Sequence, residues 1–160
     1  DTEVGPLIRP GEVSRVAEWV IESIDGGAEC LTGGEPLSET CYPPTVLYDP
    51  PPSAKVSTNE IFGPVVCVFP YTDLEEAIDR ANALPYAFQS AVFTRDIEIA
   101  TQAYSGLDAS AVMINDHTAF RVDWMPFAGL RQSGLGVGGI PHTYDEMTIE
   151  KMMVLRSDHL

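Results

Sequence analysis

Hydrophobic residues recur along the chain with two different periods. Within residues 11–27 they fall at every third or fourth position, as in Val13, Val16 and Val20. This spacing is typical of an amphipathic helix. Pro10 suits the first turn and Gly26 suits the C-terminal cap, so we predict a helix between these two residues.

Short apolar runs bounded by Gly, Pro and polar residues alternate with this helical pattern. Helical spacing returns in two segments, the first with Asp73 and Glu76 as a capping-box pattern. The predicted strands cover residues 28–32, 44–48, 65–69, 87–94 and 109–115, and the further helices cover 72–85 and 95–107. Because strands alternate with helices, we predict an α/β fold of three αβα layers around a mostly parallel sheet.

The pattern changes after Asn115. Residues 116–139 show no clean period and combine aromatic residues with five glycines. A loop of this length within a compact domain is usually functional or disordered, and its aromatic residues argue against disorder. A short helix over 142–148 and a final strand over 150–156 are expected to complete the chain.

Composition narrows the classes of protein that fit. The 160 residues are 44% hydrophobic and 21% charged, an ordinary globular composition without an apolar run near the roughly 20 residues of a membrane span. We therefore expect no membrane association. The net charge of −15 and nine scattered Lys and Arg residues oppose nucleic-acid binding. The acidic start lacks both a signal-peptide pattern and an initiator Met, which suggests processing, trimming of a tag or excision from a longer chain.

Three cysteines, Cys30, Cys41 and Cys67, are odd in number and widely spaced. This number and spacing of cysteines fit neither a disulfide framework nor a zinc site, and they favour a reduced, cytoplasmic compartment. Cys67 lies within an apolar run and is interpreted as inert core. Because the three histidines are isolated as well, we expect no metal site and no catalytic triad.

Gly134, Gly136 and Gly139 spell the G-x-G-x-x-G pattern of a dinucleotide-binding loop. The context of the pattern argues against that function. The motif must follow a strand directly and open a helix, yet residues 125–133 precede it and Pro141 follows it closely. We interpret this segment as a loop that needs positive φ at several positions.

The stretch "NEIFGPVVCVFPY" places Glu60 and Phe62 at the mouth of the strand predicted for Val65–Phe69. A carboxylate there can accept two hydrogen bonds from a vicinal diol such as a ribose, and an aromatic ring can pack on a flat heterocycle. Ligands of open parallel sheets bind at strand ends, although usually at the carboxyl ends. A surface acid in a loop is the alternative interpretation.

At these residues the sequence resembles the aldehyde dehydrogenase superfamily. "NEIFGPVV" matches the family motif E-x-F-G-P, and "MPFAGLRQSGLGVGG" matches the segment P-F-G-G-x-K-x-S-G-x-G-x-x-G. "GPLI" and "MTIEKMMVL" fit in order and spacing, so the similarity runs from about Thr2 to Arg156. Ala128 and Arg131 depart from the usual Gly and Lys, and "GVGG" replaces the common "GREG".

The resemblance implies a role for several residues. Glu60 would bind the nicotinamide ribose hydroxyls of NAD or NADP, and Phe62 would contact the nicotinamide side. Residues 117–124 would form the loop that anchors the aldehyde substrate, with Arg121 and Phe127 as substrate-binding residues. Residues 1–148 would be the C-terminal portion of the catalytic domain, and 149–160 an oligomerisation strand and tail of a homo-oligomer.

The resemblance also implies what lies outside these 160 residues. The family's nucleophilic cysteine, its general-base glutamate, its oxyanion-hole asparagine and its Rossmann-type domain all lie upstream of the E-x-F-G-P motif. None of Cys30, Cys41 or Cys67 inherits the nucleophile's role, so we predict that the chain alone is inactive. An alternative function is a non-catalytic structural or regulatory module that associates through exposed apolar surface.

Arg121 leaves two interpretations open. Its guanidinium can hold a carboxylate, a phosphonate or a similar anion at the far end of the aldehyde. The favoured alternative is a salt bridge to Asp116 or Asp123, which lie nearby in the sequence.

Overall fold

The computed structural model describes residues 2–158. The chain divides into two compact units, Asp1–Thr72 and Asp73–Leu160. Each unit combines helices with strands, which confirms the predicted α/β class. No helix among the described residues is long and apolar enough to cross a bilayer.

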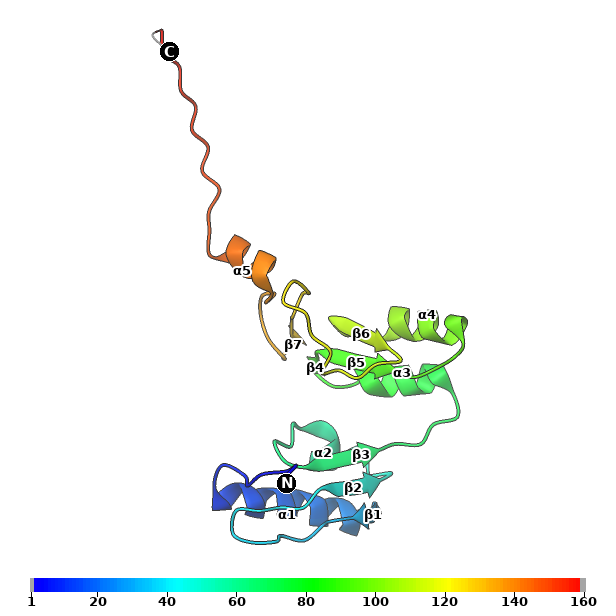
Figure 1. The fold of residues 1–160 in the computed structure, drawn as a ribbon. Coiled ribbons are helices and arrows are strands. Elements are labelled where there is room, and N and C mark those ends of the chain that lie inside the picture. The colour runs from blue at the N-terminus through cyan, green and yellow to red at the C-terminus, as the bar shows by residue number, and fades with distance from the viewer. Residues whose placement is uncertain (1, 159–160) are drawn as a thin grey trace. The chain divides into compact units, whose positions relative to one another are not determined.

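The first unit packs one long helix against a three-stranded sheet. Helix α1 spans Pro10–Asp25, as its apolar spacing predicts, and the sheet has the order β1 (Glu29–Thr32), β2 (Thr45–Tyr48) and β3 (Val65–Val68). Strands β1 and β2 are antiparallel, whereas β2 and β3 are parallel with Val46 opposite Val66. A short helix, α2 (Lys55–Thr58), precedes β3. Figure 1 shows α1 lying along the strands of this unit.

The core of the first unit lies between α1 and one face of the sheet. It consists of buried Val13, Val16, Val20, Tyr42, Leu47, Ala54 and Val56. Val65 and Cys67 of β3 pack against this cluster, but Val66 is 59% exposed and Val68 is exposed as well. The predicted strand is confirmed, and only one of its faces is packed against the core. Successive side chains of a strand point to opposite faces, and α1 covers one face only.

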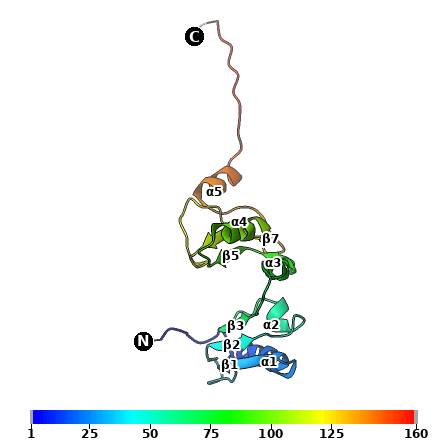
Figure 2. The ribbon, with the colours of Figure 1, turned by 90° about the vertical axis from the view of Figure 1, so that its right-hand side faces the viewer.

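The second unit contains a parallel β-α-β crossover. Helix α3 (Leu74–Asn82) begins at Asp73, whose carboxylate accepts a hydrogen bond of 3.0 Å from the backbone N–H of Glu76. Strand β5 (Gln89–Val92), helix α4 (Ile97–Gly106) and strand β6 (Ala111–Ile114) follow, and β5 and β6 pair in parallel. Both orthogonal views show α3 and α4 beside this pair (Figures 1 and 2). The predicted order of elements is confirmed here.

The strand expected over residues 87–94 is divided in the structure. A two-residue strand, β4 (Tyr86–Ala87), pairs antiparallel with β7 (Leu130–Arg131), and β5 begins after Phe88. The division arises because the two parts pair with different partners. The pairing of β4 with β7 also ties part of the long loop to the segment between α3 and β5.

The C-terminal part of the second unit ends in an unpaired segment. Helix α5 (Ile140–Glu146) begins two residues before the predicted helix. Residues Ile149–Leu155 are extended, pair with no described segment, and expose most of their apolar side chains, including Ile149 (94%) and Met152 (85%). Figure 2 shows this segment leaving α5. A strand needs a hydrogen-bonded neighbour, so its predicted role in subunit association stays a prediction.

Candidate functional site

The segment that carries Glu60 and Phe62 joins α2 to β3. Phe62 adopts a left-handed backbone conformation, with φ of 48°, and its side chain is 74% exposed. Left-handed conformations are costly for residues with a bulky side chain, and such strain often occurs at functional sites. The left-handed conformation and exposure of Phe62 are consistent with the ligand-binding function expected from the sequence.

Helix α1 holds this segment from one side. Arg15 donates a hydrogen bond of 2.5 Å from Nη2 to the carbonyl oxygen of Ile61, the residue between Glu60 and Phe62. The guanidinium is itself fixed by Glu12, at 2.8 Å from Nε to Oε2, and lies 4.5 Å from the ring centroid of Trp19. Arg15 therefore positions the backbone at the centre of the candidate site.

Gly63 brings the same segment close to the core. A Cβ atom at this position would lie 2.9 Å from Cγ2 of Val16, a residue with no exposed surface. Glycine is required here because two chain segments approach closely, and no positive φ is involved. This close approach and the Arg15 hydrogen bond fix the segment on both sides of Phe62.

A hollow of about 510 Å³ lies beside Phe62. This volume is common for part of a small-molecule site. Its lining comprises Pro6, Leu7, Ile8, Glu12, Arg15 and Phe62. Glu60 does not line this hollow. Its carboxylate is exposed and makes no hydrogen bond or ion pair with the residues that the structure describes, so it is available to a ligand. An acceptor without a partner and an exposed ring on one rigid segment fit a ligand with a diol and a flat ring.

Two neighbouring arginines, Arg15 and Arg9, lower the pKa of the Glu12 carboxyl. The side-chain hydrogen bond from Arg15, followed by that from Arg9, holds the pKa of Glu12 below its ordinary value of 4.5. Glu12 therefore stays ionised across the neutral range and keeps Arg15 oriented toward the carbonyl of Ile61.

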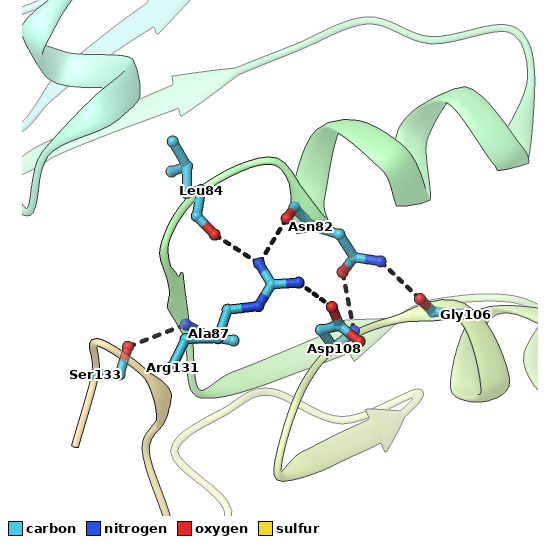
Figure 3. Close-up of polar contacts among 7 residues, drawn as sticks. All are labelled: Asn82, Leu84, Ala87, Gly106, Asp108, Arg131 and Ser133. Carbon is cyan, nitrogen blue, oxygen red and sulfur yellow. Dashed lines mark hydrogen bonds and ion pairs between the residues drawn. The ribbon is translucent and has the colours of Figure 1, made fainter. Parts of the chain in front are cut away.

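In the second unit, Arg131 fixes the start of the glycine-rich loop (Figure 3). Its Nη1 donates hydrogen bonds of 2.6 Å to the carbonyl oxygens of Asn82 and Leu84, and its Nη2 pairs with the carboxylate of Asp108. Asn82 in turn donates to the carbonyl oxygen of Gly106 and accepts from the N–H of Asp108. We call Asn82, Leu84, Asp108 and Arg131 the Arg131 cluster; it joins the loop to the ends of α3 and α4.

The two predicted substrate residues lie together. The Cζ atom of Arg121 lies 4.3 Å from the ring centroid of Phe127, and the ring of Phe88 meets Phe127 edge-on at 4.8 Å. The backbone of Phe127 exchanges two hydrogen bonds with Gly138. These contacts hold Phe127 in place and put the cation over an aromatic face.

The favoured salt bridge of Arg121 is wrong. Arg121 makes no ion pair with Asp116, Asp123 or any other described residue. The Asp116 carboxylate instead accepts a hydrogen bond of 2.8 Å from the N–H of His117. The guanidinium is drawn to Phe127, which the sequence separation alone does not reveal.

Other residues of the predicted anchoring loop line a hollow of about 380 Å³ in the second unit. Phe120, Val122 and Trp124 line it together with Met125 and strand β6. Arg121 is not part of this lining, so the loop presents aromatic residues to the hollow and the cation elsewhere. The predicted loop thus provides two distinct surfaces.

Cys67 and the glycine-rich segment are the other candidates that the sequence offers. Burial raises the pKa of the Cys67 thiol above its ordinary value of 9.0, which makes the reactive thiolate scarcer. The described residues hold no group of three or more His, Cys, Asp or Glu side chains suited to a metal. Gly136 and Gly139 have positive φ, which agrees with the interpretation of their segment as a loop.

Two arginines were not among the predicted site residues. Arg15 lies on an amphipathic helix, where the sequence gives no sign of a long-range partner. In the sequence, Arg131 stands out only as a replacement of the usual Lys of the motif. Its φ of 55° is unusual for a non-glycine residue.

Comparison with known proteins gives matches over nearly the whole chain. Residues 1–153 match the model described as the aldehyde dehydrogenase family. The chain is 37% identical over 154 residues to 3-sulfolactaldehyde dehydrogenase of Priestia aryabhattai, covering 96% of this chain and 32% of that protein. The chain therefore spans about a third of the length of the curated relatives it matches.

Solved structures give the same result. Aldehyde dehydrogenase 21 from Physcomitrella patens, in complex with the reaction product succinate, matches with a TM-score of 0.91 at 36% identity. That match covers 99% of this chain and 33% of the other. Glyceraldehyde-3-phosphate dehydrogenase GapN from Methanocaldococcus jannaschii, complexed with NADP, matches with a TM-score of 0.84 at 37% identity and covers 91% of this chain and 31% of that chain.

Proposed function

The chain belongs to the aldehyde dehydrogenase family, and we propose that it supplies part of the cofactor site and one substrate wall of an NAD(P)-dependent enzyme that oxidises an aldehyde to a carboxylic acid. The observation that carries this proposal is the segment from Glu60 to Gly63. It holds an acceptor without a partner among the described residues and an exposed ring in a left-handed conformation, both fixed against α1.

Each residue of this segment has a distinct task in the proposal. The carboxylate of Glu60 accepts hydrogen bonds from the ribose hydroxyls beside the nicotinamide, and Phe62 packs against the nicotinamide side. Arg15 keeps the intervening carbonyl in place. When bound, NAD(P)+ supplies the hydride acceptor, and small errors in its placement are costly to the rate.

The second unit contributes the substrate side. Phe127 forms a wall beside the aldehyde and is kept in register by Gly138 and Phe88. The Arg131 cluster positions the loop that carries this wall. The named substrates or products of the three relatives above carry an anionic group, which makes anionic aldehydes the first class to assay.

We further propose that the 160-residue chain alone has no dehydrogenase activity. Nucleophilic catalysis needs an activated thiolate. None of the three cysteines matches the family position of the nucleophile, and the Cys67 pKa is raised, which disfavours its thiolate.

The alternative is a non-catalytic module that associates through exposed apolar surface. The extended apolar residues Ile149–Leu155 favour some form of association, and we propose that this segment forms a strand between subunits of a homo-oligomer in the reduced cytoplasm. Association and catalysis are compatible when the chain is part of a longer enzyme.

One assay tests the proposed function. The full-length enzyme that contains this segment and the purified 160-residue chain are each mixed with NAD+ or NADP+ and an aldehyde. We expect growth of the reduced-cofactor absorbance with the former and none with the latter. Activity of the verified 160-residue chain would refute its predicted inactivity, and an inert full-length protein would favour the association module.

A further inference from the structure

A hollow of about 390 Å³ in the second unit is lined by Phe93, Thr94, Arg95 and Asn115. Phe93 directly follows β5 and Asn115 directly follows β6, and these two strands pair in parallel (Figure 1). The hollow therefore lies at the carboxyl ends of neighbouring parallel strands, where open α/β sheets bind their ligands. Its volume is within the range of small-molecule sites. None of the four residues is among those proposed to contact the cofactor or the aldehyde.

Arg95 brings an unpaired positive charge to this hollow. Its side chain is exposed and makes no hydrogen bond or ion pair with the residues that the structure describes. Asp96, its neighbour in the sequence, accepts a hydrogen bond of 2.8 Å from the N–H of Glu98 at the start of α4. Asp116 accepts one of 2.8 Å from the N–H of His117. The guanidinium therefore keeps its donors available, although the net charge of the chain is −15.

The other two polar residues of the lining offer further donors. Oδ1 of Asn115 accepts a hydrogen bond of 2.8 Å from the N–H of Thr94, and Oγ1 of Thr94 accepts one of 3.1 Å from the N–H of Asp96. The Nδ2 hydrogens of Asn115 and the hydroxyl hydrogen of Thr94 find no acceptor in the described part of the chain. The free polar groups of the hollow are thus donors, which suit a ligand that carries acceptor oxygens.

Backbone bonds hold these donors in place. Asn115 has a left-handed backbone conformation, with φ of 58°, and its N–H donates a hydrogen bond of 2.8 Å to the carbonyl oxygen of Val92. Together with the bond to Thr94, this contact fixes the amide between the two strand ends. A donor that is already fixed loses little freedom when a ligand binds. Beside it, the ring of Phe93 is 71% exposed and provides a flat apolar surface.

We propose that this hollow binds a small molecule in which an anionic group, a phosphate or a carboxylate, is joined to a flat ring. Arg95 and Asn115 donate hydrogen bonds to the oxygens of the anion, and Phe93 packs against the ring. The planar fork of a guanidinium matches the oxygens of both anions. The inference does not depend on the proposed dehydrogenase function, because none of its evidence involves the cofactor or the aldehyde.

Titration of the ¹⁵N-labelled 160-residue chain tests the site. The probe is phenyl phosphate, and the signal is the amide resonance of Thr94, whose N–H contacts Asn115. Benzoate carries a carboxylate on the same ring, inorganic phosphate is the anion alone, and benzyl alcohol provides the ring without charge. We expect saturable shifts with a ring-bearing anion, about 2- to 10-fold weaker binding of the anion alone, as an aromatic contact predicts, and no shift with benzyl alcohol.

Four variants assign the binding to the lining. Arg95→Gln should lower the affinity for phenyl phosphate by about 10- to 100-fold, as loss of a hydrogen bond to a charged group predicts. Asn115→Asp tolerates the left-handed conformation and keeps an acceptor for Thr94, but it replaces the free donors with a negative charge and should weaken binding as strongly. Phe93→Ala should reduce the affinity for phenyl phosphate to that for inorganic phosphate. Arg156→Gln is the matched control, because Arg156 is exposed in the same unit and unpaired among the described residues.

The variants should keep the folded amide spectrum, since each of the four substituted side chains is exposed. If one of them loses that spectrum, isothermal calorimetry of the full-length enzyme repeats the comparison of wild type with Arg95→Gln. The difference between these two affinities then reports on the hollow, because other anion sites are the same in both proteins.

Each outcome has a definite meaning. Weaker binding in Arg95→Gln and Asn115→Asp, with unchanged binding in Arg156→Gln, would support the site. The relative affinities of phenyl phosphate and benzoate would identify which anion it prefers. No saturable shift of Thr94 with either ring-bearing anion, or equal affinity in wild type and Arg95→Gln, would overturn the proposal. So would binding that depends on Arg121 instead of Arg95.

Discussion

At the scale of single residues, Gly63 shows how packing restricts the cofactor segment. Gly63→Ala would put a methyl group 2.9 Å from Cγ2 of fully buried Val16. We expect the free energy of unfolding to fall by about 1–3 kcal/mol, the usual cost of adding a methylene to a packed core. The midpoint of urea unfolding, followed by Trp19 fluorescence in a Trp124→Phe background, measures it.

Gly5→Ala is the matched control, because a Cβ at Gly5 has no neighbour within 4 Å. It should leave the midpoint nearly unchanged. If Gly63→Ala behaved like this control, Val16 would not be in tight contact with the segment.

Glu12 gives a pH dependence with a definite sign. Its folded pKa is lowered from 4.5, first by the Arg15 hydrogen bond and then by that of Arg9. A lowered folded pKa means that the stabilising effect is present above the unfolded pKa and disappears as pH falls through the folded value. We expect Glu12→Gln to destabilise the chain at neutral pH, and this difference from wild type should shrink in acid.

Urea titrations at neutral pH and at about pH 3 measure this difference, since below both pKa values the carboxyl is protonated in both states. Glu18→Gln serves as the control, because Glu18 is exposed on the same helix and makes no ion pair with the described residues. A difference for Glu12→Gln that is constant with pH would contradict the assigned role.

At the scale of elements, the Arg131 cluster is expected to stabilise the pairing of β4 with β7 in the second unit. Arg131→Ala removes two hydrogen bonds to carbonyls and the pair with Asp108. We expect faster amide hydrogen exchange in β4 and β7 and a loss of stability of about 1–3 kcal/mol, as for hydrogen bonds to a charged donor. Arg131→Lys should be intermediate, because one ammonium replaces the planar fork imperfectly.

Arg95→Ala is the control for this pair of variants, since Arg95 has no polar partner in the described part of the unit. Exchange in β4 and β7 should match the wild type in that variant. Unchanged exchange in Arg131→Ala would show that backbone pairing alone holds the loop.

The sequence predicts elements well where the signal is local. Apolar spacing locates α1, and the capping pattern of Asp73 locates the start of α3. Features that depend on partners distant in sequence are missed. Examples are the division of residues 86–92 between two strands, the one-sided burial of β3 and the free state of Arg121. Glu60 and Phe62 are candidates from the sequence because their residue types are unusual before an apolar strand, whereas Arg15 looks like any polar helix residue.

At the scale of the whole molecule, the C-terminal segment is expected to control association. Deleting residues 149–160 removes exposed apolar side chains, including Met152 and Val154. Exposed apolar patches promote contact between molecules. We expect the intact chain to show concentration-dependent association in sedimentation experiments and the chain ending at Thr148 to remain monomeric.

Point variants show whether association depends on the apolar side chains of this segment or only on its presence. Met152→Asp with Val154→Asp should act like the deletion, whereas Glu150→Gln should associate like the wild type. Equal association of the intact and shortened chains would assign the contact to another surface, such as the exposed face of β3.

The most direct test of the central claim is hydride transfer in the full-length enzyme with Glu60→Gln. A neutral amide accepts hydrogen bonds from a ribose diol less well than a carboxylate. We predict that single-turnover formation of reduced cofactor slows by about 10-fold or more, the effect of losing a charged acceptor, while Glu18→Gln matches the wild type. Unchanged single-turnover and steady-state kinetics in Glu60→Gln would remove Glu60 from the cofactor site and contradict the account.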